Sequence, residues 1–433
     1  MKNNNHLATK ILIGLAVGIV AAVATLIAGA WWPDVLTVMR RVSTAVFDPV
    51  GQVFLRMLFF VVIPLVFTSL ASGVAQLGRL DRLGPLAGRT FLLFFLNMAI
   101  ATAIGLVAMN TIQPGHHLDP EAKAQLMTEF GGNADKAIAR EQAQPTPGLG
   151  MLVDMFMPKN LFGAFVGFSR DSLGEVLPLI LFAILVGAAG TQLGEERRAK
   201  LLGGLDMVTE IMTRIVGFAL RIAPYAVPAM IYSVIVKVGI DVLIALAVFV
   251  AVVGVCLMLH LFGTMSLWLR FLARRNPLTF FRQIRPVLIT AFSTSSSSAS
   301  LPASLQSANE ELKLSPSTSG FVLPLGATMN MSGTALYEGC VVLFVAQAFG
   351  VDLSLTQQCM LMFLSVLSAV AVAGIPGGSL PLIAGLLVTF GVPPGGIAII
   401  FGADRILDML RTTTNVGSDM VTATVVDAQV RRG

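Results

Sequence analysis

Residues 402–426 read GADRILDMLRTTTNVGSDMVTATVV, and this stretch decides how the rest of the chain is interpreted. In a helix of about 3.6 residues per turn, six polar side chains lie on one face: Asp404, Asp408, Arg411, Thr412, Asn415 and Asp419. The opposite face is mostly Ile, Leu, Met and Val. A water-soluble amphipathic helix would have the same pattern. Inside a bilayer, however, charged side chains cost several kcal/mol, so this face would have to turn toward a protein interior or a wet cavity.

Composition favours the bilayer. The chain has 433 residues, of which 55% are hydrophobic and only 12% charged, and its mean hydropathy is +0.81. These values are typical of an integral membrane protein. The net charge of +5 comes from short Arg and Lys clusters between apolar runs, where basic residues orient membrane helices. No basic groove with interleaved aromatic residues is present, so a nucleic-acid partner is not expected.

The sequence does not predict an enzyme or a transition-metal protein. Three cysteines fall inside apolar segments without ligand spacing: Cys256, Cys340 and Cys359. His116 and His117 lie in a polar loop and His260 lies in an apolar helix, so the histidines do not form a metal motif. No Ser/His pair, catalytic pair of aspartates or metal constellation has credible spacing.

Apolar runs of the length of a transmembrane helix recur along the chain. The first, 11–32, is interpreted as an uncleaved spanning helix because it is long enough to cross the bilayer. Others follow at about 45–75, 90–112, 176–189, 195–236, 242–269 and 320–349, before the final helix. Residues 113–148 form the one long polar stretch, predicted to be an external loop. Basic loops assigned to the cytoplasm place both termini inside, as in a multi-pass protein of the cell membrane.

Two apolar segments are interrupted at their centres and are predicted to be re-entrant hairpins. Residues 286–312 contain the serine run 293–300, which by itself would suit a flexible linker. Residues 351–390 contain GIPGGS at 374–379, which would suit a surface turn. Because apolar arms flank both interruptions, hairpin tips that line a cavity explain them better. Such paired interruptions indicate the binding site of a secondary transporter.

The polar patch from Gly326 to Thr334 interrupts the seventh apolar run. Its two glycines predict local unwinding, which would expose carbonyl oxygens. Hard monovalent cations bind carbonyl and carboxylate oxygens, so this patch together with Asn415 and Asp419 predicts a sodium site. The alternative is a structural network that satisfies buried polar groups.

Three ionisable residues suggest the substrate and the coupling ion. Arg411 could simply neutralise nearby aspartates, but its planar fork also matches a substrate carboxylate. Asp408, one turn earlier, could hold an ammonium group, and the pair together describes an acidic amino acid. Glu338 is either a proton-relay or ion-linked carboxylate, or a residue near the membrane surface.

These motifs resemble the dicarboxylate/amino acid:cation symporters, the family of the excitatory glutamate transporters and the archaeal aspartate transporters. The resemblance rests on four motifs in the family's order and spacing: SSSSASLP (295–302), LPLGATMNMSGTALYEG (323–339), AGIPGG (373–378) and DRILDMLRTTTNVGSD (404–419). It extends more loosely to the amino terminus.

The resemblance implies an all-α membrane fold of eight transmembrane helices and two re-entrant helical hairpins, with inverted repeats, a homotrimer and an elevator mechanism. It divides the chain into scaffold helices one and two (1–75), transport-domain helix three (84–113), an external loop (114–150), scaffold helices four and five (151–237) and a transport domain (239–429). The last contains helix six, the first hairpin (286–312), helix seven (315–349), the second hairpin (351–390) and helix eight (392–429).

The resemblance also implies roles for individual residues. Substrate would bind Ser296, Ser297, Ser298, Thr334, Ile375, Asp408, Arg411, Thr412 and Asn415. One sodium would bind near Gly326, Asn330, Asn415 and Asp419, and another near Thr328, Ala369, Val370 and Val372. Glu338 stands where eukaryotic members keep a proton-carrying glutamate.

The chain departs from the family pattern at two places. Ser332 replaces an aspartate thought to bind a third sodium, and Asn97 and Met98 replace hydroxyl ligands of the same ion, so that site is predicted to be absent or altered. The family's second arginine, expected at Ser295 or Met409, is missing from both positions, and Arg405 could substitute for it only if the local geometry allows.

The sequence therefore predicts a symporter that imports L-aspartate or L-glutamate with sodium, and with protons as a second candidate ion. The alternatives are a carrier of C4-dicarboxylates or neutral amino acids with the same fold, and a carrier coupled to protons alone. A channel or a receptor remains open as well. The expected partners are an acidic amino acid, the lipid bilayer and two further copies of the chain.

Overall fold

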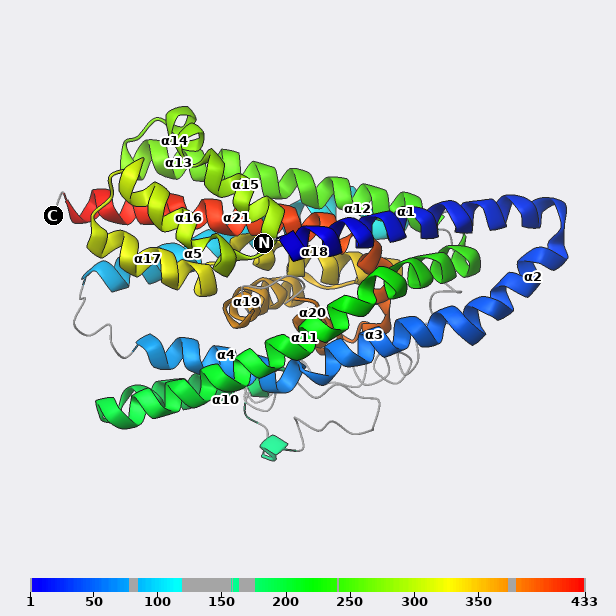
Figure 1. Cartoon of the computed structure of the whole chain (residues 1–433), viewed down its shortest axis with the longest axis horizontal. Helices are drawn as coiled ribbons and strands as arrows, with labels where there is room; N and C mark the ends of the chain where they lie inside the picture. Colours follow the sequence, from blue (N-terminus) through cyan, green and yellow to red (C-terminus); the bar gives the residue numbers. More distant parts are fainter. Residues whose placement is uncertain are drawn as a thin grey trace.

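The computed structural model describes residues 2–77, 85–118, 157, 159–162, 176–239, 241–372 and 379–431. Every regular element within these ranges is a helix (Figure 1). Four helical stretches of the described chain are long and apolar enough to cross a membrane: Ile13–Trp31, Gly88–His116, Val242–Ala273 and Pro316–Ala348. The last of these is buried along its whole window, so it lies inside the protein rather than against lipid.

The amino-terminal part is a nearly continuous helical path. Its elements are α1 (Lys2–Trp31), α2 (Pro33–Val42), the π-helical turn η1 (Ser43–Phe47), α3 (Asp48–Phe60) and α4 (Val62–Leu77). Pro33 occupies the first position of α2, where a missing N–H costs nothing. The second apolar segment, predicted at about 45–75, is thus part of a longer helical path that begins at Pro33.

Two later helices complete this half of the molecule. They are α10 (Val176–Thr191) and α11 (Glu195–Val238), close to the predicted fourth and fifth spans. α11 packs along α1, α3 and α4, and α10 packs against α4. A partly buried ion pair joins α11 to the start of α3. Lys237 Nζ lies 2.7 Å from Asp48 Oδ2, and Ser233 donates to Asp48 at 2.5 Å. The region 151–169 lies almost entirely outside the described residues.

The other half is built from α5 and the chain after residue 240. α5 (Pro85–Ile112) is followed by the 3₁₀ turn η3 (Pro114–His117). The predicted sixth span is one long helical path through α12 (Asp241–Met258), η4 (Leu259–Thr264), α13 (Met265–Trp268) and η5 (Leu269–Ala273). η4 and η5 are π-helical, and such widened turns often lie at functional positions.

The first interrupted segment forms a helical hairpin. α14 (Pro277–Gln283) leads into α15 (Arg285–Thr294), which packs against α16 (Ser297–Glu310). The chain reverses at Ser295, whose φ is +50°, and the Ser296 side chain then accepts the Ala299 N–H to cap α16. The interruption is shorter than the serine run predicts, because residues 297–300 and Pro302 are helical.

The seventh apolar run and the second interrupted segment follow. α17 (Pro316–Met329) and α18 (Ser332–Ala348) are separated at Asn330 and Met331, so the predicted unwinding is confirmed. α19 (Leu355–Ala371) begins with a capping box formed by Ser354 and Gln357. α20 (Leu380–Thr389), the turn η6 (Pro394–Gly396) and α21 (Ile397–Val430) complete the chain. The Gly/Pro tip of this segment lies outside the described residues.

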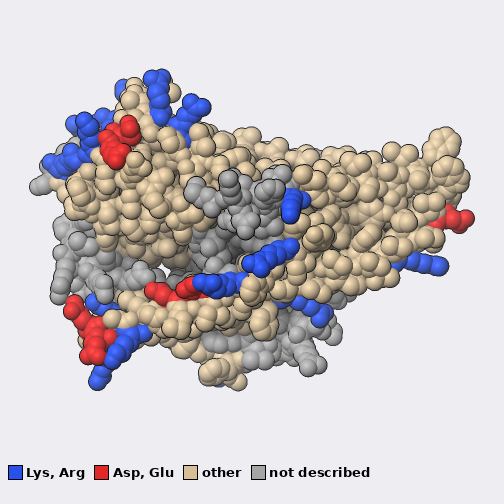
Figure 2. All heavy atoms as spheres, in the orientation of Figure 1, with Lys and Arg blue, Asp and Glu red and all other residues tan. Residues whose placement is uncertain are grey.

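In Figure 1 the helices α4, α10 and α11 lie on one side, α13 to α17 and α21 lie on the other, and α19 and α20 lie between them. α21 packs against α12, α15, α17 and α18, so it runs through the middle of the second group. Figure 2 shows basic side chains clustered at the end of the molecule where α14 and the start of α11 are found.

We expect Gly18→Ala to destabilise the protein. A Cβ at Gly18 would lie 2.8 Å from the Pro228 carbonyl oxygen of α11, and backbone cannot yield as a side-chain tip can. Overpacking of this kind costs ~1–3 kcal/mol. Thermal unfolding in detergent should show a lower midpoint. Gly204→Ala on α11, where nothing lies within 4 Å, is the control and should unfold at or above the wild-type midpoint.

A buried polar site around the last helix

α21 is buried on nearly all sides from Ala403 to Asp427. The prediction that its polar face turns inward is therefore confirmed, and the opposite apolar face is buried as well. All six side chains of the polar face are at most 7% exposed. Charged groups withdrawn from solvent to this extent need partners close by.

Arg411 is at the centre of the site and has carboxylates on two sides. Its Nη2 lies 2.7 Å from Asp408 Oδ1 and its Nε donates to the same oxygen at 2.9 Å. Its Nη1 donates to Asp404 Oδ1 at 3.0 Å. The predicted neutralising role is therefore real in the present structure. The guanidinium is held in a fixed plane by these bonds, which also suits recognition of a second carboxylate.

Tyr337 of α18 supports the cluster from the other side. Its hydroxyl donates to Asp404 at 2.8 Å, and the guanidinium carbon of Arg411 lies 4.5 Å from the centre of its ring. The stacked ring contributes a cation–π attraction of the order of 1–2 kcal/mol when desolvated. Tyr337 is completely buried. The sequence analysis did not identify Tyr337, because the sequence around an aromatic residue in an apolar run does not predict which residue of another helix it contacts.

Arg405 partly fills the place of the missing second arginine. Its Nη1 lies 3.5 Å from Asp408 Oδ2, and Arg405 is about one helical turn before Asp408 on the same helix. The Arg405 side chain is only 11% exposed, so the contact is shielded from solvent. The local geometry that the sequence left undecided thus permits Arg405 to face Asp408.

Asn415 joins α21 to the start of α18. Its Oδ1 accepts the backbone N–H groups of Gly333 and Thr334 at 2.8 and 3.3 Å, and its Nδ2 donates to Thr334 Oγ1 at 3.0 Å. These are orphan donors of a helix amino terminus, and Asn415 satisfies them from outside. Gly333 makes the approach possible, since a Cβ there would lie 2.6 Å from the Arg411 carbonyl oxygen.

Asp419 lies against the end of α17. A Cβ built at Gly326 would overlap its carboxylate, so only glycine allows this contact. Asn330, in the break between α17 and α18, donates to Asp419 Oδ1 at 2.9 Å. The structure therefore brings together Gly326, Asn330, Asn415 and Asp419, as predicted for one sodium site.

Residues assigned to the second cation and to the hairpin tips are less fully described. Thr328 is exposed and donates to the Leu325 carbonyl, whereas Ala369 and Val372 are buried at the end of α19. Ser296 and Ser297 are buried and Ser298 is exposed, at the start of α16, which packs on α21. Thr412 is buried. Val370 is partly buried, and Ile375 lies outside the described residues.

Glu338 and two residues of other helices extend the buried polar region. Glu338 is 0% exposed, and neither of its carboxylate oxygens has a hydrogen-bond partner among the described residues. Asn97 of α5 donates to Asn330 Oδ1 at 2.7 Å, and His260 of η4 lies 2.9 Å from Asn97 Oδ1. Sequence reasoning dismissed His260 because it had no metal partner, although an ionisable residue in an apolar span was itself a signal.

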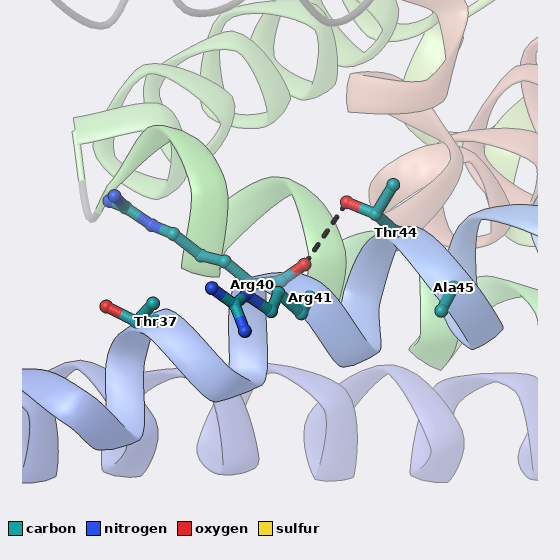
Figure 3. A pocket seen from close by; sticks show the side chains of 5 residues that line it. All are labelled: Thr37, Arg40, Arg41, Thr44 and Ala45. Atoms are coloured by element: carbon teal, nitrogen blue, oxygen red, sulfur yellow. Dashed lines mark hydrogen bonds between the residues drawn. The ribbon is translucent and has the colours of Figure 1, made fainter.

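One pocket of the described residues does not belong to this site. It has a volume of about 490 Å³ and lies on α2 and η1, where most of the side chains that line it are exposed: Thr37, Arg40, Arg41, Thr44 and Ala45 (Figure 3). No group of three or more His, Cys, Asp or Glu in the described part of the chain could hold a metal ion.

A family model described as the sodium:dicarboxylate symporter family matches residues 7–429. The chain belongs to this family. The resemblance inferred from the motifs is thereby confirmed, and so is the prediction of a transporter rather than an enzyme. Together with its apolar helices, family membership makes the chain a multi-pass membrane protein.

Known relatives extend over almost the whole chain. A proton/sodium-glutamate symport protein of Bacillus caldotenax is 31% identical over 97% of this chain and 93% of its own length. A proton/glutamate-aspartate symporter of Escherichia coli (strain K12) is 28% identical over 88% of this chain and 84% of its own. A C4-dicarboxylate transport protein of Rhizobium etli is 30% identical over 98% and 88%.

We expect Gly326→Ala to weaken sodium-dependent stabilisation of this family member. The new methyl group would displace the Asp419 carboxylate from the break between α17 and α18. A given sodium concentration should then raise the thermal unfolding midpoint of the purified protein less than it does in wild type. Gly320→Ala on the same helix, where nothing lies within 4 Å, should keep the full sodium response. A normal response in Gly326→Ala would contradict a cation site at Asp419.

Proposed function

We propose that this protein is a secondary active symporter that imports L-aspartate or L-glutamate together with sodium and protons. The observation that carries the proposal is the buried cluster of one guanidinium, Arg411, and the carboxylates Asp404 and Asp408. The names of the relatives support it, since they transport glutamate, aspartate or C4-dicarboxylates with sodium or protons.

Substrate recognition follows from the geometry of the cluster. The side-chain carboxylate of the substrate binds the planar guanidinium of Arg411. Asp404 accepts from this guanidinium and from Tyr337, and so keeps it in position. Asp408 receives the substrate ammonium, and Arg405 remains beside it to balance its charge. Arg411 and Asp408 therefore exchange part of their mutual interaction for interactions with substrate. Ser296, Ser297, Ser298, Thr334, Thr412 and Asn415, with Ile375 of the second hairpin, complete the proposed substrate shell.

Cation coupling acts through residues shared by the two sites. Asp419 with Gly326, Asn330 and Asn415 binds one sodium, and Asn415 also holds the Thr334 end of α18 against the substrate side. Bound sodium therefore orders the residues that complete the substrate site. A second sodium binds near Thr328 and the carbonyl groups of Ala369, Val370 and Val372.

Glu338 is the candidate proton carrier. It is buried between α18 and its neighbours, and its oxygens have no hydrogen-bond partner among the described residues. An unpaired carboxylate withdrawn from water is strongly disfavoured in the charged form. A neutral, protonated Glu338 therefore suits the state in which the site moves across the membrane.

The finer architecture is part of the same proposal. The transport domain comprises helix three (84–113) and the region 239–429, and the scaffold comprises the regions 1–75 and 151–237. Three copies form a homotrimer, and the transport domain moves as an elevator. Both termini lie in the cytoplasm, as the positive-inside rule predicts from the basic loops of the sequence.

Uptake of labelled L-aspartate into proteoliposomes tests the proposal. Accumulation should follow an imposed sodium gradient and increase with an added inward proton gradient. Competition by succinate distinguishes a carrier of acidic amino acids from a carrier of C4-dicarboxylates, the alternative that the C4-dicarboxylate relatives favour. Because Asp408 supplies a partner for an ammonium group, L-aspartate should compete at far lower concentration than succinate. Accumulation driven by protons alone would contradict sodium coupling.

We expect Arg411→Lys to reduce L-aspartate uptake by at least ~100-fold. A lysine keeps the charge that Asp404 and Asp408 require, but it cannot form two parallel hydrogen bonds to a carboxylate. Losing charge-assisted bonds of ~1.5–3 kcal/mol each accounts for this factor. Arg214→Lys is the matched control. Arg214 forms an exposed ion pair with Glu210 on α11, so this variant should transport normally. Unchanged L-aspartate affinity in Arg411→Lys would refute the assigned role.

Glu338→Gln should separate proton coupling from sodium coupling. The amide is close in size to a protonated carboxyl group but cannot release a proton. We expect sodium-driven uptake to persist and its response to a proton gradient to disappear, as measured in the same proteoliposomes at equal membrane potential. Gln358→Ala near the start of α19, at a half-buried residue that bonds to Asn110, is the control. A retained proton response in Glu338→Gln would exclude this residue as the carrier.

A further inference from the structure

A chain of hydrogen bonds crosses the buried interior from η4 to α21 and ends on Asp419. His260 Nε2 lies 2.9 Å from Asn97 Oδ1, and Asn97 Nδ2 donates to Asn330 Oδ1 at 2.7 Å. Asn330 Nδ2 in turn donates to Asp419 Oδ1 at 2.9 Å. Four separate helical segments contribute to it, and none of these side chains is more than 4% exposed. The proposed function gives no role to His260 or Asn97.

Chemistry fixes the direction of every bond in this chain. Asp419 Oδ1 accepts from the Asn330 NH₂ group, so the oxygen of Asn330 is turned toward Asn97. Asn97 must then donate to that oxygen and present its own oxygen to His260. His260 therefore donates from Nε2. Its Nδ1 has no partner among the described residues, and in this tautomer it carries no hydrogen, so no donor is stranded.

The same chain occupies an oxygen that a cation could otherwise bind. Asn330 Oδ1 is covered by the Asn97 NH₂ group, which is the positive end of an amide dipole. Nearby, Met98 is completely buried and apolar, and Ser332 Oγ lies 3.1 Å from Ser418 Oγ. These neighbours supply no carboxylate. A fixed hydrogen-bond donor thus stands on the side of Asn330 that faces away from Asp419.

We propose that His260 and Asn97 are positioning residues that set the sodium affinity of the Asp419 site, an inference that rests on the proposed sodium coupling. By holding Asn330 in one orientation, they keep its NH₂ group on Asp419 Oδ1, so the carboxylate is already aimed when sodium arrives. Without the His260 donor, Asn97 can flip. The oxygens of Asn97 and Asn330 then repel each other, and the site spreads over several arrangements of which only one binds well.

Two amide substitutions at His260 differ mainly in reach and make a matched pair. The amide nitrogen of glutamine can stand close to the position of Nε2, whereas that of asparagine stands near Nδ1 and falls short of Asn97. We expect His260→Gln to remain within about threefold of wild type. We expect His260→Asn to raise the sodium concentration for half-maximal effect about tenfold, the factor that corresponds to one hydrogen bond.

The quantity measured is the sodium midpoint, which is the sodium concentration that gives half of the maximal effect. It is measured in two ways on the full-length protein. One is sodium-dependent L-aspartate uptake in proteoliposomes, and the other is the sodium-induced rise of the unfolding midpoint in detergent. The KM for L-aspartate at saturating sodium should change less than about twofold. Asn110→Leu is the control on α5, because its amide pairs with Gln358 at an exposed position and should leave the sodium midpoint unchanged.

Each outcome bears on the inference. Equal sodium midpoints in wild type, His260→Gln and His260→Asn would overturn it, as would a loss of L-aspartate affinity at saturating sodium in place of a sodium shift. If His260→Asn does not fold, Asn97→Ser, which shortens the same link, must show the sodium shift instead. Wild-type protein that is stabilised by sodium but does not take up L-aspartate would refute the proposed substrate, while the sodium midpoints of the variants would still decide this inference.

Discussion

The rest of this structure depends on the need to keep Arg411 charged inside the protein. A guanidinium cannot be neutralised at any accessible pH, so burial requires partners, and Asp404 and Asp408 supply them on the same helix. Removing one partner of such a buried pair typically costs ~3–5 kcal/mol. α21 is therefore buried on nearly all sides, and the helices around it position the polar groups of the site that α21 does not itself supply.

Enclosure of α21 explains why its neighbours are broken. α17 and α18 are separated at Asn330 and Met331, and the backbone amides that follow the break donate to a polar side chain of α21. Asn415 satisfies the amides at the start of α18, and Gly333 lets the two backbones approach. The break thus has defined partners, as backbone inside a membrane protein requires. One asparagine connects the proposed substrate site to the proposed cation site.

Local pattern predicted the elements well, because spacing along one helix is enough to place its polar face. The face from Asp404 to Asp419, the break near Asn330 and the first hairpin are all present. Contacts between side chains of different helices could not be predicted from spacing along one helix. Tyr337 under Arg411 and His260 beside Asn97 depend on how distant helices pack, and an isolated polar residue in an apolar run does not name its partner. The serine run was also assigned too long an interruption, since Ser296 caps α16 and lets helix resume at once.

Charge balance gives a physical reason for cation coupling in this site. Asp404 and Asp408 carry two negative charges, and Arg405 and Arg411 carry two positive charges, so the four side chains sum to zero. An acidic amino acid brings a net charge of −1, which a low-dielectric interior does not tolerate alone. A cation at Asp419 only neutralises that carboxylate, so at least one further positive charge must accompany the substrate. A second sodium at a site without a carboxylate would supply it, whereas a proton on Glu338 would only neutralise Glu338. The proposed stoichiometry of transport is thus linked to the burial of this cluster.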